Sequence, residues 1–300
     1  LAELSACTLG MTGTHPYADP HQQRFVSTPD YQWVREQLGY VAQRNITFGL
    51  HVHIGVDDAE RAIYVANRMR LWIGPLIALA ANSPYLDGVD TGWDAARVYA
   101  FGAFPRAGIP PKLRSYEEFA AQMDALIAAS AITKPRQIWW NVRVHPEYGT
   151  VEFRACDVQI SVPRTAAIVA LVQALVVAYG DAHRAGKPEP YLPGAYLEDL
   201  RWKGMRFGLN GDVVDAETSE VISMPALVER MVEVAWPAAT KLGTTGYLDV
   251  VSEILQLGNG AAAQRVALAE EGGDLRKLQH RLLREAVEKG IRHPGLDSLG

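Results

Sequence analysis

Two histidines in a segment of alternating residue types are the first candidates for chemistry. Residues 47–56 alternate between large apolar side chains and mostly glycine or histidine, which predicts a strand with His51 and His53 on one face. At ~3.4 Å per residue, the two imidazoles would stand about 7 Å apart. Neutral imidazole is a good ligand for divalent metals, and protonated imidazole pairs with phosphate. A solvated strand face carrying two histidines is the competing interpretation, and for this short motif alone we favour it.

Two further strands are predicted over residues 139–144 and 150–157, because apolar and polar residues alternate in both. A four-residue loop over residues 146–149 would place Arg143 opposite Glu152. A five-residue loop would shift the register by one residue and set an arginine against the apolar face of the other strand. Burial and charge therefore both favour the four-residue loop.

In that register the paired strands present one carboxylate and two guanidiniums on a common face. Glu152 could bind a hard cation through oxygen, and Arg143 and Arg154 could each hold phosphate through two oxygens. Asn141 would lie opposite Arg154. An ordinary cross-strand salt bridge, worth ~1 kcal/mol or less, is the alternative, and these residues alone favour neither interpretation.

A third candidate follows a stretch rich in turn-forming residues. Asn-Ser-Pro at 82–84 and Gly-Val-Asp-Thr-Gly at 88–92 precede a lone arginine, Arg97. Loops carry function more often than they carry packing residues. By itself the stretch is only a long loop, and Arg97 is the weakest of the candidates.

These segments belong to a first half that mixes strands and helices, followed by a second half that is mostly helical. Asp57 and Ser115 each precede a glutamate by three residues, the capping-box spacing at a helix start. Thr28 precedes a proline and predicts a third helix start. The most apolar stretch, residues 166–179, is shorter than the ~20 residues that span a bilayer and predicts a buried helix. The expected fold class is α+β, an antiparallel sheet backed by helices.

Composition restricts the class of partner and the compartment. The 300 residues carry a formal net charge of -5 with no block of like charges, so nucleic acid or an anionic membrane is a poor match for the main partner. Cys7 and Cys156 are far apart and form neither a disulfide framework nor a thiolate metal site. Residues 1–10 lack the features of a signal peptide. We expect a reducing, cytoplasmic location.

Taken in order along the chain, the motifs resemble those of the glutamate–cysteine ligase type 2 family, carboxylate–amine ligases related to glutamine synthetase. Any one motif is weak, but the series is specific and covers nearly the whole chain. The matching segments are GTHP at 13–16, GLHVHIG at 49–55, NSP at 82–84, GVDTG at 88–92, WWNVR at 139–143, GTVEFR at 149–154, RW at 201–202 and RFGL at 206–209.

The resemblance implies a glutamine synthetase-like fold in which an antiparallel sheet forms an open funnel lined by metal and nucleotide groups. It implies a single catalytic domain over residues 1–300, sheet-rich over 1–160 and helical over 161–300. The implied reaction has two steps: ATP phosphorylates a carboxylate, expected to be that of glutamate, and an amine such as cysteine displaces phosphate. Mg²⁺ or Mn²⁺ would neutralise the triphosphate. A homo-oligomer is also implied.

The resemblance also assigns roles to residues of this chain. Two strands would supply the metal ligands, two arginines would hold the transferring phosphoryl or acyl-phosphate group, and three polar residues would contact substrate or phosphate. The metal ligands are then His51 and Glu152, the catalytic residues Arg143 and Arg154, and the substrate- or phosphate-binding residues His53, Arg97 and Asn141.

The chain departs from the family pattern in three places. The family opens with a strand bearing a Gly-x-Glu-Glu-Glu type motif, and nothing like it precedes Gly13. Asn141 replaces an aspartate, and Asp30 replaces an arginine before Tyr31. Two interpretations stay open: the chain is N-terminally incomplete, or it is a natural variant with an incomplete set of metal ligands.

Three alternatives compete with a glutamate–cysteine ligase. A ligase of the same chemistry that uses a different amine in secondary metabolism would carry the same ATP and metal motifs. A non-catalytic binding subunit is favoured by the missing glutamate-rich strand. A metal-dependent hydrolase built on His51 and His53 is disfavoured, because two arginines beside a metal suit phosphate better than water activation.

Overall fold

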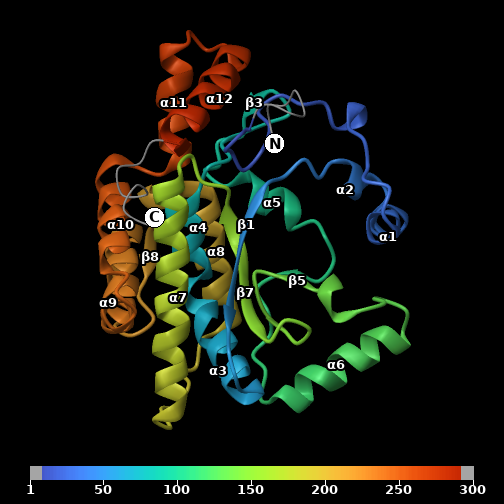
Figure 1. Cartoon of the computed structure of the whole chain (residues 1–300), viewed down its shortest axis with the longest axis vertical. Coiled ribbons are helices and arrows are strands. Elements are labelled where there is room, and N and C mark those ends of the chain that lie inside the picture. Colours follow the sequence, from blue (N-terminus) through green and yellow to red (C-terminus); the bar gives the residue numbers. More distant parts are fainter. Residues whose placement is uncertain (1–8, 292–300) are drawn as a thin grey trace.

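The computed structural model describes residues 9–291, with side chains through residue 286, so Cys7 lies outside the described residues. A three-stranded antiparallel sheet runs through the molecule in the order β1-β7-β6 (Figure 1). Its strands are β1 (Gly49–Gly55), β6 (Val142–His145) and β7 (Thr150–Asp157). The predicted four-residue loop is confirmed, since Arg143 lies opposite Glu152 and His145 opposite Thr150.

Helices cover one face of this sheet and form most of the second half of the chain (Figure 1). Ser115 caps its helix as predicted, accepting a 3.1 Å bond from the Glu118 N–H, whereas the helix predicted at Asp57 is capped by Asp58. The helices are α1 (Pro29–Leu38), α2 (Tyr40–Gln43), α3 (Ala59–Met69), α4 (Ile73–Ala80), α5 (Ala96–Phe101), α6 (Tyr116–Ala128), α7 (Val162–Arg184), α8 (Gly194–Phe207), α9 (Met224–Leu242), α10 (Thr245–Leu257), α11 (Gly260–Glu270) and α12 (Leu275–Ile291).

Three pairs of short strands lie outside the main sheet in the described part of the chain. They are the antiparallel pair β2 (Tyr85–Leu86) and β3 (Val89–Asp90), the parallel pair β4 (Ala107–Gly108) and β5 (Trp139–Trp140), and the antiparallel pair β8 (Asp212–Val214) and β9 (Val221–Ser223). The last pair is a hairpin within the otherwise helical second half. An α+β fold with an antiparallel sheet backed by helices is therefore confirmed, and the described strands close no barrel.

The prediction of one continuous strand over residues 139–144 is wrong, because the strand breaks at Asn141. The Asn141 N–H donates to the carbonyl of Gly108 at 2.7 Å, while its own carbonyl accepts from the Arg154 N–H at 2.9 Å. The chain thus changes partner at this residue, from β4 on one side to β7 on the other. Asn141 is held at the junction of the two pairings, where it borders a cavity.

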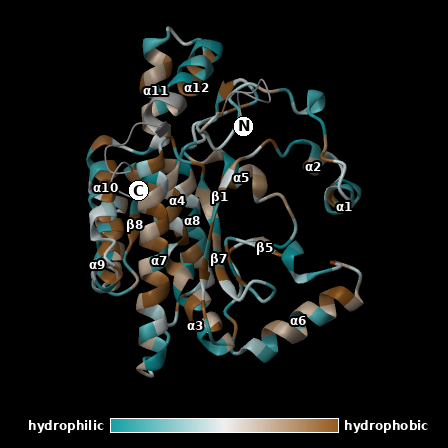
Figure 2. Cartoon of the chain, in the orientation of Figure 1, coloured by the Kyte–Doolittle hydropathy of each residue, from teal (hydrophilic) through white to brown (hydrophobic). Residues whose placement is uncertain are grey.

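The hydrophobic core lies between the sheet and α3, α4 and α7. α7 is longer than predicted and, by length and composition, apolar enough to cross a membrane. Half of its apolar window is buried inside the protein, where the helix packs against α3, α9 and α10. Apolar residues concentrate along α4 and α7 (Figure 2). Burial in the core therefore accounts for the apolar character of α7.

An irregularity in the pairing of β1 with β7 sets which side chains reach the open face of the sheet. Leu50 pairs with Cys156 and Val52 with Phe153, so Arg154 and the following alanine together lie opposite His51. An extra residue of this kind is a β-bulge, which bends a strand and redirects side chains. Phe153 and Cys156 both reach the core as a result.

Candidate active site

A cavity of about 500 Å³ borders the open face of the sheet. β1 and β7 supply one wall, α5 a second and α1 a third. Its polar lining residues include four of those predicted from the sequence, and most of its apolar lining residues are aromatic. The four predicted residues are His51, Arg97, Asn141 and Arg154, and the aromatic ones are Tyr31, Phe48, Phe101, Phe104 and Trp139.

Glu152 on β7 contacts side chains from both neighbouring strands, β1 and β6. Its carboxylate is 1% exposed and accepts a 2.5 Å hydrogen bond from Nε of Arg143. Its other oxygen, Oε1, lies 3.2 Å from Nδ1 of His51 and 3.7 Å from Nε2 of His53. The structure therefore brings together the two predicted metal ligands, the second histidine and one predicted arginine.

Charges around Glu152 fix its protonation. Burial by itself would raise the pKa of Glu152, but the hydrogen bond from His51 and the charges of Arg143 and Arg154 outweigh burial and lower the pKa well below its usual value. Burial lowers the pKa of His51, so this imidazole is neutral at pH 7. When a cation binds, His51 can carry its proton on Nε2 and present the Nδ1 lone pair, which lies 3.2 Å from Oε1 of Glu152, so that both atoms could bind the same cation.

Arg143 is held entirely by protein groups. Besides Glu152, its guanidinium donates through Nη1 to the carbonyl of Arg136 at 2.7 Å and to that of Ile138. It borders a small recess beside the β6–β7 turn rather than the main cavity. Phosphate binding by Arg143 stays a prediction, and its contacts in the structure hold Glu152 in place.

Arg154 is different, because no carboxylate within the described residues pairs with its side chain. The residue is 9% exposed and its guanidinium lies over the ring of Phe101, 5.3 Å from the centroid. Burial, with the charges of Arg143 and Arg97, lowers the pKa of Arg154 to about 10, so it stays cationic at neutral pH. The charge of Glu152 acts in the opposite direction, but no ion pair or hydrogen bond among the described residues joins its carboxylate to Arg154. A buried cation without such a direct partner is costly, and here it faces a cavity.

Arg97 lines the same cavity but has a buried partner that the sequence did not reveal. Its Nε donates to Asp157 at 2.5 Å, and its Nη2 donates to the carbonyls of Ala155 at 2.6 Å and Cys156 at 2.9 Å. Its Nη1 lies close to Gly49, where a Cβ atom would come within 2.9 Å of it. Nη1 is thus the part of Arg97 that remains for a ligand.

Asp157 was missed by sequence reasoning, although one signal was present. Its carboxylate also accepts from the Asn82 N–H at 2.8 Å and from the Ser83 hydroxyl at 2.7 Å. The Asn-Ser-Pro segment was singled out as a motif, yet its partner lies some 75 residues away in the sequence. The segment anchors the loop that leads to Arg97.

Of the remaining predicted residues, Asn141 lines the cavity and His53 does not. Asn141 is 5% exposed, and its Oδ1 has no hydrogen-bond partner among the described residues. His53 contacts Thr150 through Nδ1 at 3.0 Å and lies near a stacked pair, His145 and Tyr148, whose ring centroids are 4.3 Å apart. Sequence reasoning missed this stacked pair, because it placed Tyr148 in the loop and gave His145 no role in the site.

A divalent cation would find few protein donors here. Among residues 9–286, no group of three or more histidine, cysteine, aspartate or glutamate side chains could hold a metal ion. His51 and Glu152 supply at most two donors. That number fits a nucleotide-bound Mg²⁺, which takes most of its ligands from phosphate oxygens and water.

α1 closes the cavity from the side opposite the sheet and explains one departure from the family pattern. Asp30, which stands where the family has an arginine, forms ion pairs with Lys134 and Arg136, and so ties α1 to the segment that precedes β5. The hydrogen bond from Lys134 is the largest of the effects that lower the pKa of Asp30. Tyr31 and Val34 on the same helix line the cavity.

Similarity to a solved structure defines the class of fold. The crystal structure of glutamate–cysteine ligase from Francisella tularensis in complex with AMP superposes with a TM-score of 0.65, covering 93% of this chain and 73% of that one, at 12% sequence identity. At this identity the match establishes the fold alone. The antiparallel sheet and its helices share the fold of that enzyme.

Sequence comparison establishes the family. The family model described as glutamate–cysteine ligase family 2 matches residues 3–286. A candidate glutamate–cysteine ligase 2 from Solibacter usitatus is 33% identical over 300 residues, which is 100% of this chain and 77% of that protein. The glutamate–cysteine ligase of Haloferax volcanii is 33% identical over 266 residues, 89% of this chain and 71% of that protein. The chain belongs to the glutamate–cysteine ligase family 2, and it is an ATP-dependent carbon–nitrogen ligase.

Proposed function

We propose that this ligase joins the side-chain carboxylate of glutamate to an amine, with cysteine as the first candidate, through an acyl-phosphate intermediate. The observation that carries the proposal is Arg154, a buried guanidinium that faces the cavity with no carboxylate partner among the described residues. A phosphoryl group would supply the missing negative charge, and a guanidinium can bind two of its oxygens at once.

The two steps balance as follows. A carboxylate oxygen attacks the γ-phosphorus of ATP, the bond to the bridging oxygen breaks, and ADP leaves. The amine nitrogen then attacks the acyl carbon, the acyl–oxygen bond breaks, and phosphate leaves with one oxygen that began in the carboxylate. The amine proton passes to solvent or to the departing phosphate.

The chain's own residues divide this work by position. Arg154 would hold the transferring phosphoryl group, where charge increases in the transition state. Nη1 of Arg97 would hold a substrate carboxylate, while Asp157 fixes the rest of that guanidinium. Asn141 borders Arg154 and would contact phosphate or substrate through its unsatisfied amide. His53, beside Glu152, would take a supporting phosphate contact.

His51 and Glu152 would hold the divalent cation, Mg²⁺ or Mn²⁺, with Arg143 keeping the carboxylate in place. When bound, such a cation neutralises part of the triphosphate charge.

We also propose that residues 1–300 act as one catalytic domain in a homo-oligomer, that the enzyme is cytoplasmic, and that neither nucleic acid nor a membrane is its partner. These last points follow from the family resemblance and composition.

Isotope transfer tests the intermediate directly. Glutamate whose side-chain carboxylate carries heavy oxygen should deliver one labelled oxygen to each phosphate released, in a reaction that requires the amine. Hydroxylamine in place of the amine should give a hydroxamate. Unlabelled phosphate formed at the same rate as product would contradict an acyl phosphate.

The identity of the amine is tested with a panel. Phosphate release from ATP is measured with glutamate and cysteine, then with other amino acids and small amines, each with Mg²⁺ and again with a chelator. We expect the highest kcat/KM with cysteine and no turnover without the cation. A preference for another amine would keep the chemistry and replace the substrate. ATP hydrolysis that no amine accelerates would contradict the ligase assignment to this cavity.

A further inference from the structure

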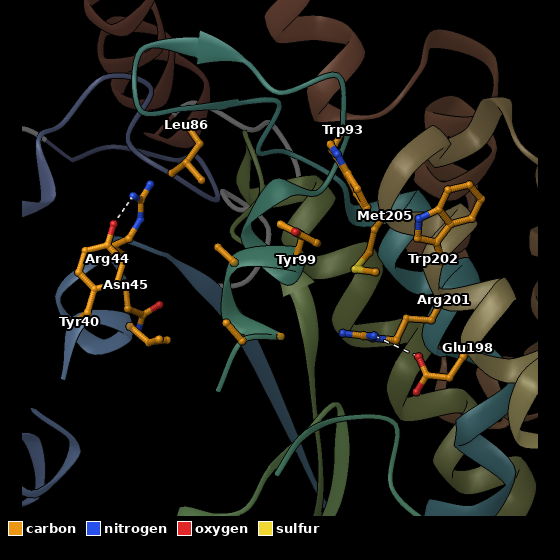
Figure 3. Close-up of a pocket in the computed structure, with 14 residues that line it drawn as sticks. Tyr40, Arg44, Asn45, Leu86, Trp93, Tyr99, Glu198, Arg201, Trp202 and Met205 are labelled. Carbon is orange, nitrogen blue, oxygen red and sulfur yellow. Dashed lines mark hydrogen bonds and ion pairs between the residues drawn. The ribbon is translucent and has the colours of Figure 1, made fainter. Parts of the chain in front are cut away.

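A second and larger cavity lies on the other side of α5 from the 500 Å³ cavity that we propose as the active site and call the catalytic cavity. Its volume is about 950 Å³, and its walls come from the α2 region, the β2–β3 segment, α5 and α8 (Figure 3). α5 separates the two cavities, since Tyr99 and Ala100 border this one while Val98 and Phe101 border the other. Asn45 borders both. Pockets of 300–1,000 Å³ are the usual size for small-molecule sites.

Aromatic rings line this cavity and remain open to it. Tyr40 is 63% exposed, Tyr99 61% and Trp202 42%. Trp93 lies against Tyr99, with ring centroids 4.8 Å apart and planes inclined by 34°. Figure 3 shows these rings on opposing walls, with Tyr99 on the helix between them. Large exposed rings on a concave surface offer stacking surface to a planar ligand.

One guanidinium gives the cavity its charge. The Arg201 side chain is 12% exposed, and within the described residues its Nε is buried without a hydrogen-bond partner. Its Nη1 meets Glu198 at 3.2 Å, but that carboxylate is 56% exposed, so solvent weakens the pair. The other lining cation, Arg44, already pairs with Asp87. Arg201 is thus the cation with unused donor capacity.

Two glycines, Gly102 and Gly108, leave room for this guanidinium. A Cβ atom at Gly102 would lie 3.3 Å from Nη2 of Arg201, and one at Gly108 would lie 3.9 Å from its Cζ. Arg201 and Trp202 also form one of the sequence motifs for which the catalytic cavity provides no role. This motif therefore belongs to the larger cavity rather than to the catalytic cavity.

We propose that this cavity is a second ligand-binding site and that it takes a small planar aromatic molecule carrying one anionic group. The rings of Tyr99, Trp93 and Trp202 would contact the planar part, and Arg201 would hold the anion through its unused donors. The proposal does not depend on the ligase reaction, and its test requires no turnover.

Anilinonaphthalene sulfonate, a planar aromatic sulfonate, is a suitable probe. Its binding to the full chain is followed by probe emission and by quenching of tryptophan fluorescence. We expect saturable binding of one probe per chain. Arg201→Gln removes the charged donor and should raise Kd roughly 10- to 100-fold. Ala103→Phe should raise Kd comparably by filling the cavity, because Ala103 is an exposed lining residue.

Two matched variants locate the probe. Arg184→Gln removes an arginine that forms the same i,i+3 type of helical ion pair, with Asp181, outside both cavities, and should leave Kd unchanged. Arg154→Gln removes the cation of the catalytic cavity and should also leave Kd unchanged. Thermal melts of all variants check folding. If Arg201→Gln does not fold, Ala103→Phe still tests whether the probe binds in this cavity.

Three results would overturn the proposal. They are the absence of saturable binding to the wild-type chain, wild-type Kd in both Arg201→Gln and Ala103→Phe, and loss of binding in Arg154→Gln alone. The last result would place the probe in the catalytic cavity. Because these results concern binding only, failure of the second site and failure of the proposed ligase reaction are separate outcomes.

Discussion

Two buried arginines line the catalytic cavity, and their surroundings differ sharply. Arg97 donates to a buried carboxylate and two carbonyls, so its charge is compensated by the protein. Arg154 has an aromatic ring beneath it and no carboxylate partner among the described residues. A charge with a direct buried partner contributes first to the fold, even where one donor is left for a ligand. A buried charge without a direct partner is retained against its desolvation cost and favours an anionic ligand.

The two regions should therefore respond differently to substitution. Changes at the Arg97–Asp157 pair should appear first in the free energy of unfolding. Changes around Arg154 should appear in turnover while the folded state is retained. The predictions below test this division.

Asp157→Asn should have the largest effect on stability. Removing one partner of a buried ion pair leaves an uncompensated charge and typically costs about 3–5 kcal/mol. Urea unfolding measures the loss. The matched control, Asp181→Asn, breaks exposed pairs with Arg184 and Lys241 and should cost ~1 kcal/mol or less. Equal losses in the two variants would mean that Asp157 is no more structural than a surface residue.

Arg154→Lys should lower kcat by roughly 100- to 1,000-fold, the usual cost of losing one preorganised donor at a developing charge. Lysine keeps the charge but loses the planar fork, so ATP binding should weaken only modestly. Steady-state kinetics and ATP titration separate the two effects. Arg70→Lys, at a buried arginine that lines neither cavity, is the control for kcat. Near wild-type turnover in Arg154→Lys would contradict a phosphate-binding role for Arg154.

Phe101→Leu should produce a smaller effect of the same kind. The ring lies under the Arg154 guanidinium, and a cation–π contact is worth ~0.5–2 kcal/mol, or roughly 2- to 30-fold in kcat/KM. Phe104→Leu is the control, because Phe104 stacks on Phe101 with centroids 4.7 Å apart. A greater kinetic effect at Phe104 than at Phe101 would show that ring packing, rather than contact with Arg154, matters.

The smallest effect should be seen at Cys156, which reports local opening of the Arg97–Asp157 region. The thiol is 0% exposed, and burial raises the pKa of Cys156 to about 12. Thiolate is therefore scarce near pH 8, and iodoacetamide should label Cys156 only after unfolding. Mass spectrometry of digested protein measures the labelling. Asp157→Asn should accelerate it and Arg154→Lys should not. Rapid labelling of native wild-type protein would show that this region opens readily.

Much of the candidate site could be predicted from short-range patterns. Alternation placed His51 and His53 on one face, and loop length with burial placed Arg143 opposite Glu152. What failed was the continuity of the strand through Asn141, because that residue's hydrogen bonds go to β4 and β7 in turn. Residues 107–108 carry no pattern that marks them as a strand partner.

The sequence by itself determined the family, the fold class and the set of polar residues on the sheet, because side-chain alternation and motif order are properties of neighbouring residues. Only the tertiary structure decided how those residues are partnered. Arg97 meets Asp157 across 60 residues of sequence, and Arg201 reaches a cavity bordered by α5. Such pairings depend on the path of the whole chain, because the carboxylates and carbonyls that compensate a buried charge come from distant parts of the sequence. Whether an arginine serves the fold or the ligand is therefore set in three dimensions.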